Sequence, residues 1–144
     1  MPTAEVKIWL ALKLRIDSLP LTFSKAWPAE TFTVPHSGNP PTLQPYIRIG
    51  TVTVDPLPVQ IATGKPHVRT GTLILTLVHP LRSGYTMPVY NQFAGTIAEH
   101  FADGTEMRYD NVCVRVTAQP HVQPGYEDNG YWTIPVSIPW RTIA

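Results

Sequence analysis

The stretch RTGTLILTLVHPLRSGY, Arg69 to Tyr85, decides how the rest of the chain is interpreted. Leucines alternate with threonine, isoleucine and valine along its first ten residues, so both sides of an extended strand here are at least partly apolar. A strand with two apolar sides is covered on both, and we therefore predict a central strand of a sheet. The Pro80 to Gly84 segment then predicts a turn, after which a helix pattern begins. The stretch contains no catalytic motif.

The clearest helix pattern is TMPVYNQFAGTIAEHFADG, from Thr86 to Gly104. The threonine is a plausible N-cap, a proline is tolerated in the first turn, and the glycine suits a left-handed residue past the end. Four apolar residues recur at four-residue steps and predict one buried stripe, namely Val89, Phe93, Ile97 and Phe101. We expect this stripe to pack against the sheet.

The first segment, TAEVKIWLALKLRIDSLP, is also predicted to be a helix. Its alanines, leucines and lysines favour helix, Thr3 can cap it, and Pro20 ends it. The alternation from Ile8 to Ile16 is compatible with a strand as well, but composition and capping favour the helix. Its apolar residues fall on more than one side, so we expect it to be buried widely or to be covered by a second chain.

The remaining pattern gives two hairpins. Alternating β-branched residues predict three more strands, in YIRIGTVTV (Tyr46–Val54), DNVCVRVTAQP (Asp110–Pro120) and GYWTIPVSIPWRTI (Gly130–Ile143). The order helix, strand, strand, helix, strand, strand predicts a single α+β domain over residues 1–144. Its sheet is expected to be mainly antiparallel and mixed, with the N-terminal helix and the central helix packed on one face. A long irregular loop is expected over 20–45, and an extended hairpin or loop over 55–68.

The last strand carries Pro135 and Pro139 on the face opposite its apolar residues. Neither proline has an N–H group, and both positions would direct that group to the same side of the strand. One side of the strand therefore cannot complete a hydrogen-bonded ladder, and we predict an edge strand with both prolines on the free side. A β-bulge inside the sheet is the alternative.

Charged residues make up only 15% of the chain, against roughly 25% in soluble domains, and the net charge is +1. A surface so poor in charge suggests contact with a partner. The lysines and arginines are scattered singly, which argues against direct or sequence-specific binding of nucleic acid. No run of about 18 apolar residues predicts a membrane span. The single cysteine, Cys113, is interpreted as a small buried residue of a chain folded in a reducing cytoplasm.

The polar residues do not form a catalytic or metal-binding pattern. The five histidines are scattered without metal-ligand spacing. GYEDNG, Gly125 to Gly130, is interpreted as a hairpin turn, since its spacing is not that of a calcium loop. ATGKPH has only the Gly64-Lys65 pair of a phosphate-binding loop. We therefore expect no enzyme activity, cofactor or metal site.

Short motifs in a fixed order give the chain a family resemblance. They are Trp27-Pro28 before the first strand, Tyr46-Ile47-Arg48 within it, Gly71 leading the next strand towards Gly84, and Phe101 to Gly104 at the end of the main helix. With these motifs the chain resembles the phage tail terminator-like family, and most of the chain takes part.

The resemblance implies a non-enzymatic virion protein that is assembled in the host cytoplasm. It implies a ring, commonly a hexamer, at the head-proximal end of the tail. Such a ring caps the tail tube, ends its polymerisation and forms the surface that joins the head. The implied partners are further copies of the chain, the tail tube protein and the head–tail connector protein.

Three alternatives stay open from the sequence alone. One is another phage structural role, as a neck, head-completion or tail-tube protein. The second is a small ligand-binding or hydrolytic domain, for which the residues offer no constellation, and the third is an unrelated soluble adaptor. Under the assembly reading, the apolar loop and the proline-bearing strand are the expected interfaces with a subunit or the tube, and the candidate residues are Leu57, Val59, Ile61, Lys65, Pro135 and Pro139.

Overall fold

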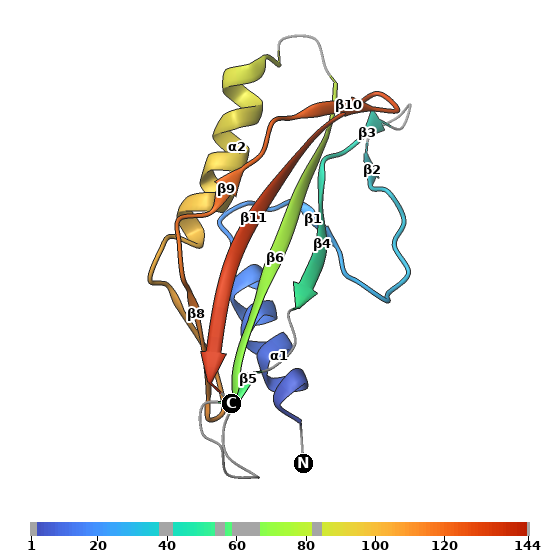
Figure 1. Cartoon of the computed structure of the whole chain (residues 1–144). Helices are drawn as coiled ribbons and strands as arrows, with labels where there is room; N and C mark the ends of the chain where they lie inside the picture. The colour runs from blue at the N-terminus through green and yellow to red at the C-terminus, as the bar shows by residue number, and fades with distance from the viewer. Residues whose placement is uncertain (1–2, 38–41, 54–56, 59–66, 82–84, 144) are drawn as a thin grey trace.

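The computed structural model of the protein describes residues 3–37, 42–53, 57–58, 67–81 and 85–143 (Figure 1). The helices are α1 (Ala4–Asp17) and α2 (Met87–His100). The long strands are β4 (Tyr46–Thr53), β6 (His67–Pro80) and β11 (Tyr131–Ile143). Short strands complete the same sheet, namely β1 (Ser24–Ala26), β5 (Leu57–Pro58), β7 (Glu106–Tyr109), β8 (Val112–Val116), β9 (His121–Val122) and β10 (Tyr126–Asp128). A separate ribbon consists of β2 (His36–Ser37) and β3 (Thr42–Leu43).

The nine-stranded sheet has the order β1-β4-β6-β11-β8-β7, and β5, β9 and β10 pair at the side of this path. Every pairing in it is antiparallel except that of β1 with β4. The predicted mixed, mainly antiparallel α+β fold is therefore confirmed. Strand β6 lies between β4 and β11, which confirms the central position predicted from its two apolar sides.

Strand β11 is not an edge strand, so that prediction was wrong. It pairs with β6 along all 13 of its residues, and on its other side with β10, β9 and β8 in turn. On that second side, the Pro135 carbonyl accepts from Gln123 N at 2.9 Å and the Pro139 carbonyl accepts from Thr117 N at 3.1 Å. The N–H and C=O of a strand residue point to the same side, so the missing donors also fall there. The prolines interrupt a continuous ladder on this side of β11, but they do not prevent pairing at the residues beside them. Three short strands therefore pair there in place of one long strand.

Helix α1 confirms the capping signals that favoured helix over strand. The Thr3 hydroxyl accepts from Val6 N at 3.4 Å, and the helix ends three residues before Pro20. Its buried residues have helical spacing and are Ile8, Ala11, Leu12 and Ile16. Apolar residues also remain on the outer side, where Val6 is 45% and Leu14 54% exposed.

Helix α2 lies where it was predicted, but its buried stripe is shifted. The buried residues are Tyr90, Ala94, Ile97, Ala98 and Phe101, whereas Val89 and Phe93 are half-buried. Four-residue steps rotate about 40° each around a helix, so the predicted stripe drifts off the buried face. The alanines let the backbone of α2 approach the sheet. Thr86 is the N-cap residue, but its side chain makes no capping hydrogen bond.

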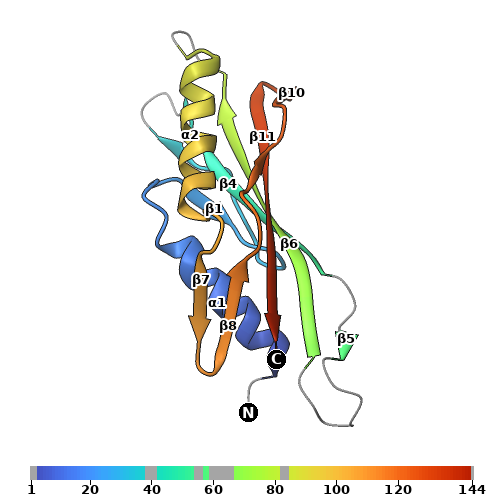
Figure 2. The same ribbon diagram turned by 60° about the vertical axis from the view of Figure 1, so that its left-hand side comes forward.

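Both helices pack on one face of the sheet, as predicted; we call this the helix face and the other the open face (Figure 2). The core joins them to residues of the central strands, namely Ile47, Ile49, Leu73, Leu75, Leu77, Ile134, Val136 and Ile138. The Arg15 guanidinium donates to the His100 carbonyl, with Nε at 3.0 Å, and so connects the C-terminal ends of the two helices.

Several short strands were not predicted from the sequence. The expected irregular loop over 20–45 contains β1, β2 and β3, and β7 follows α2. In the expected hairpin over 55–68, β5 pairs with β6 through Leu57 opposite Val68 and Pro58 opposite His67. The GYEDNG segment is a hairpin as predicted, because β10 pairs with β11 across the Asn129-Gly130 turn.

Candidate interaction site

The predicted interface residues do not form one cluster in the described part of the chain. Pro135 and Pro139 are half-buried on the open face, where they stand opposite Thr76 and Thr72 of β6. Leu57 lies in β5, beside the end of β6 that pairs with the last residues of β11. Val59, Ile61 and Lys65 lie outside the described residues, so their role stays a prediction.

The open face is the side of the sheet that no helix of the described ranges covers (Figure 2). The accessible side chains at its centre are uncharged, namely Pro135, Ser137 and Pro139 on β11 and Thr72 and Ile74 on β6, whereas Thr76 between them is buried. The Gln123 side-chain amide donates to Ser137 Oγ at 2.6 Å and so fixes the segment beside β11.

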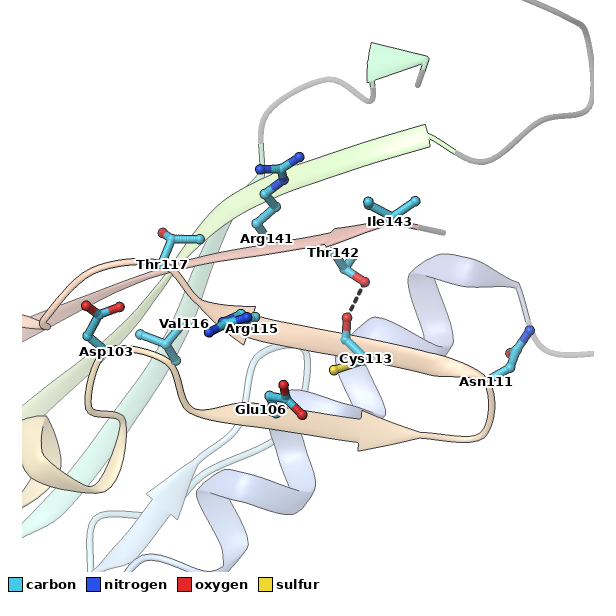
Figure 3. Close-up of a pocket in the computed structure, with 10 residues that line it drawn as sticks. All are labelled: Asp103, Glu106, Asn111, Cys113, Arg115, Val116, Thr117, Arg141, Thr142 and Ile143. Carbon is cyan, nitrogen blue, oxygen red and sulfur yellow. Dashed lines mark hydrogen bonds between the residues drawn. The ribbon is translucent and has the colours of Figure 1, made fainter. Parts of the chain in front are cut away.

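At the end of β11, the open face forms a cleft of about 780 Å³ (Figure 3). The lining residues that carry a charge are Asp103, Glu106, Arg115 and Arg141. Thr142 Oγ1 donates to the Cys113 carbonyl at 2.6 Å, which ties β11 to β8 at the cleft. Cys113 is half-buried, and no lining residue is a histidine. The guanidinium groups of Arg115 and Arg141 can bind a carboxylate or another anion, beside the two carboxylates that line the same cleft.

The sequence could have pointed to this cleft only in part. Arg115 interrupts a run of valines in its strand, and Arg141 follows the apolar residues of β11, which marks both as outward-facing. Their proximity depends on the β8–β11 register, which joins residues from separate hairpins and has no signal in either strand alone.

Two histidines have specific partners that give them packing roles. His79 is buried, and its ring stacks on Phe93 with centroids 5.5 Å apart. His100 Nε2 lies 2.9 Å from the Arg15 carbonyl and 3.0 Å from Ser18 Oγ, at the junction of the two helices. Burial lowers the pKa of His100, although the hydrogen bond to the Arg15 carbonyl acts in the opposite direction.

The described residues contain no group of three or more potential metal-ligating side chains. Among their helices, none is long and apolar enough to cross a membrane.

Two comparisons relate the chain to known proteins. The family model for the phage tail terminator protein matches residues 7–140. One solved structure superposes with a TM-score of 0.73, covering 98% of this chain and 96% of the other at 18% sequence identity, which shows a shared fold. No similar protein was found among curated proteins.

Proposed function

Because the chain belongs to the phage tail terminator protein family, we propose that it caps the tail tube as an oligomeric ring. The ring ends tube polymerisation at the head-proximal end of the tail and presents the surface that joins the head. Membership in the family makes the chain a structural protein of the phage tail, located in the virion. The ring, its position and its partners are the proposed part.

The observation that carries this proposal is the family match over nearly the whole folded chain. The surfaces support it, because a capping subunit needs contacts with its own copies and with two different partners. The uncharged centre of the open face, the charged cleft at one end of that face and the exposed apolar residues of α1 on the other side are surfaces of different chemistry. Contacts between unlike surfaces of identical subunits form a ring when their rotation closes. Six copies is the number that the family resemblance implies.

We assign the tube and connector contacts to surfaces that are separate from the subunit contacts. The apolar loop with Leu57, Val59 and Ile61, together with Lys65, is proposed to reach a neighbouring subunit or the tail tube protein. Pro135 and Pro139 contribute to a second contact through the uncharged centre of the open face. The head–tail connector protein binds the side of the ring that is turned away from the tube.

Tube assembly in the presence and absence of the chain tests the proposal. Purified tail tube protein is allowed to polymerise with and without it, and tube lengths are measured by negative-stain electron microscopy. We expect shorter tubes with a ring at one end when the chain is present. Gold-labelled antibody on purified virions should mark the head-proximal end of the tail. Unchanged tube lengths, or label along the whole tube or inside the neck, would contradict capping and favour another structural role.

A further inference from the structure

Two arginines stand side by side in the cleft at the end of β11. Arg141 of β11 and Arg115 of β8 are direct partners in the antiparallel register, and both are exposed. Like charges placed opposite each other across two strands destabilise a sheet unless an anion compensates them. The arrangement therefore suggests that an anionic group of another molecule binds beside the two arginines.

The nearby acidic residues compensate the charge of this pair only in part. Glu106 is the register partner of Arg115, but its Oε2 accepts from Arg108 Nη2 at 2.6 Å. Two other ion pairs lie at this end of the molecule, Lys7 with Asp110 at 2.9 Å and Arg69 with Glu5. In the ranges that the structure describes, neither arginine of the cleft is in an ion pair, and Asp103 is the lining acid outside any pair.

A matching acidic group lies at the other end of β11. Glu127 and Asp128 belong to β10, are exposed and have no ion-pair partner among the described side chains. The two-residue turn that follows them has positive φ at Asn129 (51°) and Gly130 (82°), the conformation of a tight hairpin turn. The acidic residues are therefore presented on a short, well-defined projection.

The acidic turn and the arginine pair of one copy cannot meet. Tyr131, opposite Asp128, and Arg141 are separated by ten steps of extended strand, or about 33 Å. Both Asp128 and Arg141 are on the open face by the alternation of β11, so one copy can present its acidic end to the arginine end of the next. Glu127 is paired with Trp132 and so lies on the helix face, which leaves Asp128 as the carboxylate on the same face as the arginines. A carboxylate beside two guanidinium groups forms charge-assisted hydrogen bonds.

We infer that the acidic turn of one subunit docks onto Arg115 and Arg141 of the next copy of this chain, with Asp128 directed at the two guanidinium groups and Glu127 adding negative charge beside it. The contact joins opposite ends of the subunit, so it is heterologous and repeats from copy to copy until it closes. It rests on the proposed ring and names the residues that hold neighbouring subunits in it.

Charge reversal in full-length chains tests the contact. One variant carries Arg115→Glu with Arg141→Glu, the other carries Glu127→Lys with Asp128→Lys. Self-association is measured by sedimentation velocity, with the protein alone and with tail tube protein added, and circular dichroism checks the fold. We expect each variant alone to associate more than about tenfold more weakly than the wild-type chain. An equimolar mixture of the two should recover assembly with both variants in equal amounts, because each contact again joins opposite charges.

A control and two contrary outcomes complete the test. Glu30→Lys with Glu99→Lys changes the net charge as much as the acidic-turn variant does, at exposed residues outside both ends, and should assemble normally. Reversed variants that assemble and shorten tubes like the wild-type chain would overturn this contact and leave the capping function standing. A wild-type chain that shortens tubes but stays monomeric on them would also overturn it. A failure of the wild-type chain to shorten tubes would contradict the proposed function instead.

Discussion

Replacing Phe101 and Phe93 by alanine, one at a time, tests which side of α2 is buried in the core. The Phe101 ring is completely buried, at 0% exposure, where α2 ends above the sheet. Phe93 is half-buried at the rim, where its ring contacts Phe23 at 5.2 Å and His79 at 5.5 Å between centroids. The two substitutions remove the same atoms, so their difference reports burial and not chemistry.

The expected losses of unfolding free energy differ. A fully buried phenylalanine replaced by alanine costs about 3–5 kcal/mol, because a cavity adds to the lost transfer energy. At Phe93, water and neighbouring chain can fill the space, so the cost is the partial burial plus two aromatic contacts, about 1–3 kcal/mol. At about 2–4 °C per kcal/mol for a chain of this size, Phe101→Ala should lower the melting temperature by roughly 6–20 °C.

Urea unfolding followed by circular dichroism gives both values by linear extrapolation, at a protein concentration low enough to keep the chain monomeric. The slope with urea should match that of the wild-type chain, which shows that the same surface is exposed on unfolding. A cost for Phe93→Ala equal to or above that for Phe101→Ala would refute the assignment of the buried stripe.

Three further changes have definite expected outcomes. Gly125→Ala should lower the melting temperature, because the new Cβ would lie 2.6 Å from Nε1 of Trp132. Gly95→Ala should raise the free energy of unfolding by about 1 kcal/mol, because alanine favours helix over glycine and the space around this residue of α2 is open. Burial lowers the pKa of His100 below 6.5, so its contribution to stability is complete above pH 6.5 and is lost as the pH falls through the lowered value; His100→Gln should flatten that part of the stability profile measured by urea unfolding. Replacing residues 59–66 with a Gly-Ser linker should leave the melting temperature of the subunit unchanged and impair tube capping, and normal capping by that variant would argue against a contact there.

Local signals in the sequence were enough for the elements that depend on local chemistry. The Thr3 cap and the stop at Pro20 determine α1, and the two apolar sides of β6 predict its place inside the sheet. The buried side of α2 was predicted wrongly because Ala94 and Ala98 lie at its centre. Alanine gives little hydrophobic signal in a sequence, and its burial here depends on how closely the helix approaches the sheet.

The position of β11 and the cleft could not be deduced in the same way. Pro135 and Pro139 specify which donors are missing, but whether short strands pair around them depends on β9 and β10, whose two or three residues carry almost no pattern. The pairing of Arg115 with Arg141 is a property of register between distant segments. Individual residues could be assigned to faces from the sequence, whereas neighbours across strands could not.

The place of β11 in the sheet also determines when a newly made subunit can fold. Of the nine strands, β11 is the last in the chain, yet it lies between β6 and the β8–β10 segments (Figure 1). While the chain is still being synthesised, the whole length of β6 on that side has no partner, and unpaired strand edges of this kind invite aggregation. Pairing between segments so far apart is also slow to form. The acidic turn and the arginine cleft both include parts of β11 or its hairpin, so a growing chain carries neither in finished form, and the proposed contact between subunits is available only to a completed chain.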